Sequence, residues 1–202
     1  MLQHLRPAIV LLALFTLLTG LVYPLAVTAV AQFAFPRQAN GEMIENGSGV
    51  VIGSALIGQN FQTAKYFHPR PSATTDTDPN DSSKTIDAPY NAAGSTGSNL
   101  GPTSQKLVDR VKAGVAAWRT GAGDGSVSAD AVTTSASGLD PDVSPANALA
   151  QAALVAKARG LPESDVRSLV LASVDPPALG FIGEPRVNIL RLNLALDRIK
   201  SP

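Results

Sequence analysis

The feature that most constrains the fold of this chain is an uncharged apolar run near its N-terminus, from Ala8 to Phe35. A helix that crosses the roughly 30 Å hydrocarbon core of a bilayer needs about 20 such residues, and this run has 28. After Arg37 the chain is mixed, polar and rich in loop-forming residues. The sequence therefore predicts a short tail (1–7), one transmembrane helix (8–35) and one extramembrane domain (36–202). Because a single span cannot enclose a pathway for a solute, we expect it to act with a partner.

A cleaved signal peptide is the alternative to a retained anchor. Arg6 would supply the basic region, and Ala29-Val30-Ala31 resembles a small-residue cleavage site. However, the apolar run is longer than a signal core, and Phe33 and Phe35 continue it beyond that site. We therefore favour a retained membrane anchor.

The basic residues around the run specify its orientation weakly. Arg6 and the terminal amine precede the run, Arg37 follows it, and the next basic residue is Lys65. This distribution slightly favours a cytoplasmic N-terminus. We therefore expect the domain to be extracytoplasmic.

Small and polar residues recur inside the run at intervals of four, which places them on one helix face. They are Thr16, Gly20, Pro24, Thr28 and Gln32, and we call them the stripe. Such residues let a second helix approach closely and can hydrogen-bond to it. The stripe is interpreted as a partner-docking face; the alternative is chance, because small residues are common in membrane helices.

The rest of the composition excludes several functions. Acidic and basic residues balance at 16 each, and no basic patch indicates nucleic-acid binding. The chain has no cysteine, and therefore no thiolate nucleophile and no cysteine-based zinc site. It lacks a G-x-x-x-x-G-K-[ST] phosphate loop, an aspartyl-phosphate motif and the T-V-G-Y-G potassium filter. Alone, the chain is neither a pump motor nor a channel.

Periodicity and capping residues predict an α+β class for the domain. Apolar residues at helical spacing predict a helix at 103–118. Ser144, as an N-cap before a proline, and Gly160 delimit a second helix. A third is expected at 162–174, before Pro176-Pro177.

Other segments carry weaker patterns. Strands are predicted at 50–57 and 131–134. Gly121 to Gly125 should break the first helix. A long ordered loop or a flexible insertion is predicted at 74–103. The segment 187–196 fits either a strand or a helix.

Candidate residues for chemistry are few. His68, the only histidine after the run, would have to serve any Ser-His-Asp triad, but it precedes a proline and fits a surface turn better. Asp76, Asp78, Asn80 and Asp87 resemble the spacing of a calcium-binding EF-hand loop. The glycine that such a loop needs at position six is replaced by an aspartate, so a solvated loop is favoured.

Several strings combine glycine or proline with apolar and hydrogen-bonding residues. They span residues 53–61, 66–73, 97–103, 135–141 and 180–188. Physically they indicate specified turns that hold a fold. Contact with a partner through some of them is the alternative.

Together these strings resemble the C subunit of the Kdp system, the ATP-driven high-affinity potassium importer of bacteria. The resemblance covers nearly the whole chain. The residues that carry it are Gly53, Gly58, Phe61, Arg70, Pro71, Ser98, Asn99, Leu100, Gly101, Pro102, Gly138, Leu139, Asp140, Asn188 and Asn193. Two departures are a leucine at 154, where relatives often carry arginine, and a longer, more acidic loop at 74–94.

The resemblance implies a non-catalytic accessory subunit in the cytoplasmic (inner) membrane, with one span and an extracytoplasmic domain. It implies two protein partners, a channel-like potassium-translocating subunit and a P-type ATPase subunit. Family members are needed for assembly and activity, and are described as catalytic chaperones that raise the ATP affinity of the ATPase subunit. No cofactor of its own is expected, because ATP would act through the partner.

An extracytoplasmic domain cannot touch cytoplasmic ATP, so an ATP effect would require coupling between distant sites. If the contact were direct, Gln151 would be the first candidate; the alternative for Gln151 is a solvent-facing helix amide. Two other functions stay open at this stage. One is a membrane-anchored extracytoplasmic hydrolase, which the single domain histidine disfavours, and the other is a secreted binding protein, which would require cleavage.

Overall fold

The computed structural model describes residues 2–122 and 125–199. The chain divides into two compact units, Met1–Ser54 and Ala55–Pro202, which are described separately below as unit 1 and unit 2.

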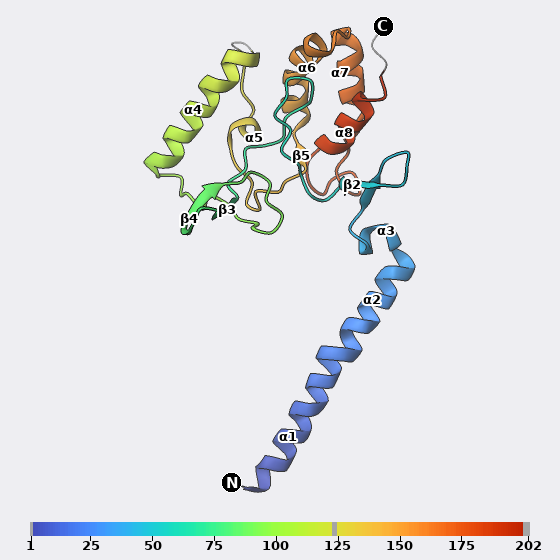
Figure 1. Ribbon diagram of the computed structural model, residues 1–202. Coiled ribbons are helices and arrows are strands. Elements are labelled where there is room, and N and C mark those ends of the chain that lie inside the picture. The colour runs from blue at the N-terminus through green and yellow to red at the C-terminus, as the bar shows by residue number, and fades with distance from the viewer. Residues whose placement is uncertain (1, 123–124, 200–202) are drawn as a thin grey trace. The chain divides into compact units, whose positions relative to one another are not determined.

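Unit 1 begins with a long helix in three consecutive parts, as Figure 1 shows. These are α1 (Leu2–Leu17), the π-helical stretch η1 (Leu18–Val22) and α2 (Tyr23–Ala34). Among the described residues, Gln3–Ala34 is the one stretch long and apolar enough to cross a membrane. The helix ends where Phe35 takes a φ of −139°, because a residue before proline disfavours the helical conformation.

A short helix and a hairpin complete unit 1. The helix α3 (Pro36–Ala39) is followed by the antiparallel strands β1 (Met43–Glu45) and β2 (Val51–Ser54). The predicted strand at 50–57 is thus confirmed in its first half. Its second half belongs to unit 2 and forms a turn.

Unit 2 combines helices with two small sheets, which confirms the prediction of mixed helices and strands. Its elements are β3 (Thr75–Asp78), β4 (Asp81–Asp87), α4 (Gln105–Ala122), α5 (Ala129–Val132), β5 (Asp142–Val143), α6 (Pro145–Arg159), α7 (Glu163–Ala172), β6 (Val174–Asp175), β7 (Arg186–Asn188) and α8 (Ile189–Leu196). β3 and β4 form an antiparallel hairpin. The other sheet is antiparallel with the order β5-β7-β6.

The hydrophobic core of unit 2 lies where α6, α7 and α8 meet the three-stranded sheet. Phe67, Val166, Val170, Val187 and Leu192 are completely buried in it. Figure 1 shows α6, α7 and α8 grouped together, with α4 to one side. Phe67 comes from an irregular segment that crosses this core, so the segment 55–73 needs specific polar partners for its backbone.

The helix predictions that rest on capping residues are confirmed. Ser144 caps α6 by accepting a hydrogen bond from the Asn147 backbone N–H, and Gly160 ends the helix at a φ of +66°. The first predicted helix is α4, which continues beyond residue 118. Its predicted break at 121–125 includes residues 123–124, which lie outside the described residues. The third helix, α7, ends at Ala172, before the two prolines, because β6 follows it.

Two predictions were wrong. The segment 131–134, predicted as a strand, contributes to the one-turn helix α5, whose Asp130 is bonded to Ser144 near the start of α6. The segment 74–103, predicted as a loop, contains the β3–β4 hairpin, whose turn is closed by a hydrogen bond from the Asn80 backbone N–H to the Asp78 carboxylate. The ambiguous segment 187–196 contains both alternatives, since β7 passes directly into α8.

Candidate functional site

Side-chain amides replace a neighbouring strand along the irregular segment that carries Phe67. Asn193 of α8 accepts a hydrogen bond from the Phe67 N–H (2.9 Å) and donates one to its carbonyl (3.0 Å). Gln151 of α6 does the same for His68, at 2.7 and 3.1 Å. Two successive residues are therefore paired by two amides from two helices, which satisfies backbone groups that burial would otherwise leave unpaired. We call Gln151 and Asn193 the amide pair.

The predicted role of Gln151 must be weighed against these bonds. The alternative of a solvent-facing amide is wrong, because Gln151 is only 6% exposed. Its Nε2 group also donates to the side-chain oxygen of Asn147 (2.9 Å), so both of its N–H groups are used within the chain. A direct contact between this amide and a nucleotide would require some of these bonds to be broken.

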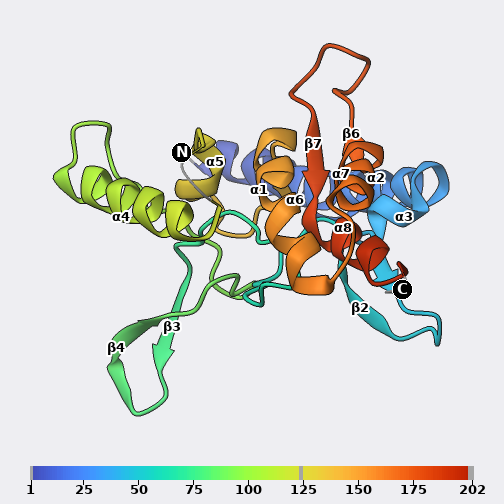
Figure 2. The ribbon, with the colours of Figure 1, turned by 90° about the horizontal axis from the view of Figure 1, so that it is seen from above.

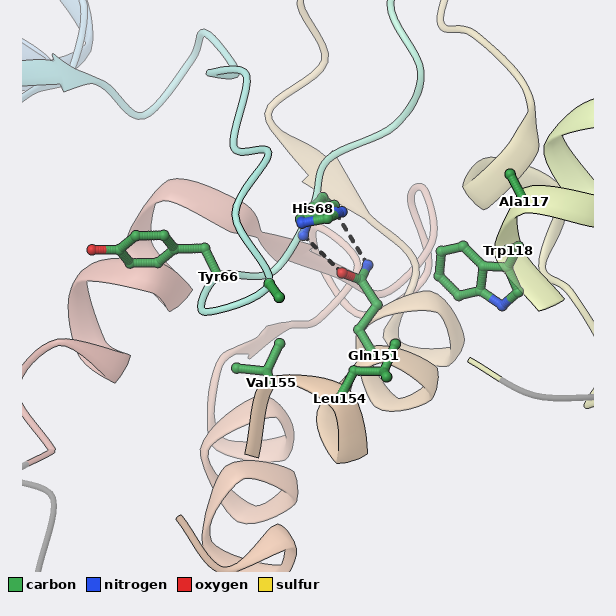
Figure 3. Close-up of a pocket in the computed structure, with 8 residues that line it drawn as sticks. Tyr66, His68, Ala117, Trp118, Gln151, Leu154 and Val155 are labelled. Atoms are coloured by element: carbon green, nitrogen blue, oxygen red, sulfur yellow. Dashed lines mark hydrogen bonds between the residues drawn. The ribbon is translucent and has the colours of Figure 1, made fainter. Parts of the chain in front are cut away.

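Gln151 of the amide pair also lines a cleft, which Figure 3 shows in close-up. The cleft has a volume of about 330 Å³ and is lined mainly by apolar groups. Its lining residues are Ala64, Tyr66, His68, Ala117, Trp118, Gln151, Leu154 and Val155. Trp118 faces it from α4, and Leu154, the departure from the family pattern, lines it from α6 at 38% exposure. The lining favours an apolar occupant over a charged one.

The His68 side chain is exposed, as the sequence predicted, and its Nε2 lies 3.2 Å from the carbonyl oxygen of Thr63. A catalytic triad requires instead that the imidazole contact a nucleophile and a carboxylate. The backbone of His68, not its ring, is the part that the fold uses. The geometry therefore gives no support to the hydrolase alternative.

A second set of family-motif residues meets at a polar junction beside the core. Arg70 forms an ion pair with Asp140 at 2.9 Å, and the Tyr90 hydroxyl donates to the Arg70 carbonyl at 2.8 Å. Burial, together with the nearby Asp140 carboxylate, raises the pKa of Tyr90, so it remains a neutral donor. Gly58 donates its N–H to the Leu139 carbonyl at 2.9 Å.

The junction is too close-packed for larger residues at two glycines. A Cβ atom at Gly58 would lie 2.6 Å from the Asp140 carbonyl oxygen. One at Gly138, whose φ is +68°, would lie 2.6 Å from the Thr74 methyl group and 2.7 Å from the Thr96 carbonyl oxygen. We therefore assign both glycines to the fold itself, in agreement with the interpretation of these strings as specified turns.

The remaining family-motif residues are distributed over other places. Asn188 caps α8 and donates to the Ala55 carbonyl (2.9 Å), while Phe61 packs on the core beside Tyr66. Ser98, Asn99, Leu100, Gly101 and Pro102 lie in the irregular segment before α4, with Asn99 at a φ of +51°. Pro71 follows Arg70 at the junction, and Gly53 lies in β2 of unit 1. The structure thus brings some of these residues together and leaves others apart.

Sequence reasoning missed Tyr90, Asn147 and Asp130. Asp130 accepts bonds from the Ser144 N–H (2.7 Å), the Ser144 hydroxyl (3.0 Å) and the Asn147 amide (3.2 Å). Although burial opposes its charged form, these bonds lower the pKa of Asp130. Through Asn147 and Gln151 the network reaches His68. In the sequence, the one signal for this network is Ser144 as the expected N-cap of α6.

The acidic spacing that resembled a calcium loop does not form one. Asp76, Asp78 and Asp87 lie in the strands of the β3–β4 hairpin. Among residues 2–122 and 125–199, no group of three or more histidine, cysteine or acidic side chains is arranged to hold a metal ion. The segment is a hairpin, so the loop part of the prediction is wrong.

The stripe on the N-terminal helix crosses the π-helical stretch η1, in which Gly20 lies. Pro24 has no backbone N–H. The residue before it, Tyr23, donates its backbone N–H to the Leu18 carbonyl, five residues earlier, which closes the wider turn of a π-helix. In an α-helix a spacing of four residues overshoots a full turn by about 40°, so such a row drifts around the helix. The wider turn of η1 reduces this drift between Thr16 and Pro24.

The two ends of the stripe differ in their surroundings. A Cβ atom at Gly20 would meet nothing within 4 Å, and Thr16 and Gly20 line an open groove on the helix. Thr28 lies in α2, as does Gln32, whose amide exchanges two hydrogen bonds with Asn40 at 3.2 and 3.0 Å. The surface at Gly20 is therefore the part of the stripe best suited to close approach by another helix.

These features define a class: a chain with one candidate membrane span among its described residues, followed by an α+β domain whose irregular segment is paired by side-chain amides. Residues 5–198 match the family model described as K⁺-transporting ATPase, c chain. The chain is 60% identical to a potassium-transporting ATPase KdpC subunit of Rhodopseudomonas palustris strain BisB18, covering 99% of this chain and 100% of the relative. It is 59% identical to that of Bradyrhizobium diazoefficiens, covering 98% of each. The chain belongs to the family of the c chain of K⁺-transporting ATPases.

Proposed function

We propose that this chain is the non-catalytic accessory subunit of an ATP-driven, high-affinity potassium import complex. The observation that carries the proposal is the match at about 60% identity along the full length of relatives named potassium-transporting ATPase KdpC subunit. In this proposal the chain crosses the cytoplasmic membrane once. Its N-terminus lies inside and unit 2 lies outside.

The partners proposed are a channel-like potassium-translocating subunit and a P-type ATPase subunit of the same complex. The stripe would supply the contact in the membrane. Support for it comes from the open groove at Thr16 and Gly20 and from the reduced drift along η1. The segment around Gly20 would be the centre of that contact.

The effect on ATP is proposed to be indirect. The side-chain N–H groups of Gln151 donate hydrogen bonds to the His68 carbonyl and to the Asn147 side-chain oxygen. This amide is therefore better suited to hold the cleft wall than to bind a nucleotide. A coupling of about 1–3 kcal/mol between subunits would change ATP affinity about 5- to 150-fold. In this account no residue of the chain touches ATP.

Growth at very low potassium tests the proposal. A host lacking the chain should fail to grow there, and the intact chain supplied on a plasmid should restore growth. A reporter fused to the C-terminus of that chain should be active only outside the cytoplasm. Normal growth without the chain would refute the accessory role, and a cytoplasmic reporter signal would refute the proposed orientation.

A further inference from the structure

The connection between β6 and β7 displays apolar side chains to solvent. Leu179 is 83% exposed, Phe181 78% and Ile182 53%. No charged residue occurs between Asp175 and Glu184. In Figure 2 this connection extends beyond the helices of unit 2. Concentrated apolar exposure of this kind marks a site of interaction, and neither the amide pair nor the junction uses it.

The tip of this connection, residues 178–183, has a defined backbone. Ala178 and Ile182 exchange two backbone hydrogen bonds of 2.9 Å. Gly180 and Gly183 have φ values of +83° and +90°, and Leu179 has a φ of +55°. These φ values lie in the left-handed backbone region, which is unfavourable for leucine and is usually occupied by glycine or asparagine. The tip therefore holds a leucine outward at a strained position, and such strain is concentrated at functional positions.

We propose that the tip inserts into the interfacial layer of the same bilayer that the N-terminal helix enters. Only residues 35–54 separate that helix from unit 2. A fully extended chain of this length spans at most about 70 Å. The tether therefore keeps the tip within reach of a membrane surface at high effective concentration, whichever side the domain occupies. Apolar side chains of interfacial segments enter about 5–10 Å into that layer.

The size of the tip favours lipid over a protein partner. Three such side chains offer on the order of 400 Å² of apolar surface, whereas a standard protein interface uses about 800 Å² on each partner. Lipid needs no complementary shape and can surround a narrow projection. Two charges follow the tip: Glu184 comes directly after it, and Arg186 pairs with Asp142 at 3.2 Å.

The absence of cysteine from the sequence allows a direct test with a single label. An Ile182→Cys variant of the full chain would carry an environment-sensitive NBD fluorophore. The chain would be placed alone in nanodiscs of phosphatidylcholine and phosphatidylglycerol, with and without a shallow nitroxide lipid. Ser82→Cys on the exposed, polar β3–β4 hairpin is the matched control. We expect blue-shifted emission at 182 and at least threefold stronger nitroxide quenching there than at 82.

A polar tip provides the second arm. Leu179→Asn with Phe181→Ser, in the Ile182→Cys background, should abolish the quenching and leave the thermal melt unchanged. Both side chains are exposed, and asparagine tolerates the backbone of position 179. Quenching at 182 equal to that at 82, or quenching that survives the polar tip, would overturn the proposal. A third result would also overturn it: a label at 182 that is shielded from water only when the other subunits are present, and that the nitroxide lipid does not quench. That result would identify a protein contact.

Discussion

At the scale of single residues, the fold of unit 2 depends on side chains that act as substitutes for backbone partners. Asn193 and Gln151 pair with Phe67 and His68, and Asn188 binds the carbonyl of Ala55. A buried N–H or carbonyl left without a partner costs about 1–3 kcal/mol. Such polar residues are therefore expected to contribute to stability as much as the core side chains beside them.

Asn193→Ala should destabilise unit 2 by about 2–4 kcal/mol, because it leaves both the N–H and the carbonyl of Phe67 unpaired in the core. Denaturant unfolding of the full chain in detergent, followed by Trp118 fluorescence, measures this loss. The control is Gln62→Ala, which shortens an exposed amide and should change stability by less than about 0.5 kcal/mol. Equal effects of the two substitutions would contradict the role given to the amide pair.

Gly58→Ala should cost about 1–3 kcal/mol, because its Cβ would lie 2.6 Å from the Asp140 carbonyl oxygen and force the junction apart. Gly101→Ala is the matched control, since a Cβ there meets nothing within 4 Å. The same unfolding measurement compares them. If Gly58→Ala were as well tolerated as Gly101→Ala, the junction would not be closely packed.

At the scale of elements, features set by neighbouring residues could be predicted from the sequence, and features set by contacts between distant residues could not. The caps of α6 are read from Ser144 and Gly160 alone. The buried state of Gln151 could not be predicted, because its partner His68 lies 83 residues away in the sequence. Similarly, α5 is held by contacts of Asp130 with α6, and the β3–β4 hairpin is built from acidic and polar residues that are typical of loops.

The bonds between α5 and the start of α6 predict a pH effect. The pKa of Asp130 is lowered in the folded state, so its contribution to stability is present above the unfolded pKa of about 3.9 and is lost as pH falls through the folded pKa. Asp130→Asn should therefore remove part of the loss of stability on acidification below about pH 4. Unfolding free energies measured from pH 3 to pH 6 test this.

Asp142 supplies the control of opposite sign. Burial raises its pKa, so its contribution is present below the unfolded pKa and is lost as pH rises through the folded pKa. Relative to the native chain, Asp142→Asn should gain stability as pH rises through that range, while Asp130→Asn loses it. Parallel curves for the two variants would contradict these assignments.

The N-terminal helix carries the prediction about assembly. Gly20→Leu should fill the groove beside Thr16 and weaken co-purification with the other subunits several-fold, because close helix approach depends on small residues. Ala26→Leu adds similar bulk two residues from Pro24, on a different face, and should leave assembly unchanged. Equal recovery of the complex with both variants would show that the stripe does not contact a partner.

At the scale of the whole molecule, the chain is a member of the family of the c chain of K⁺-transporting ATPases. Family membership follows from the comparisons along the whole chain, and the sequence strings had already indicated it through residues such as Gly58, Arg70, Asp140 and Asn193. The structure shows that these residues mainly specify turns and backbone pairing. It follows that a motif can identify the family while its residues serve the fold.

The central claim is that the chain supports the activity of a potassium-transporting ATPase without doing chemistry itself. Its most direct test is potassium-stimulated ATPase activity, measured against ATP concentration, for the complex purified with and without this chain. The account predicts that omission either abolishes the activity or raises the KM for ATP about fivefold or more, which corresponds to a coupling of at least about 1 kcal/mol. Unchanged activity and an unchanged KM for ATP in the complex that lacks the chain would contradict the account.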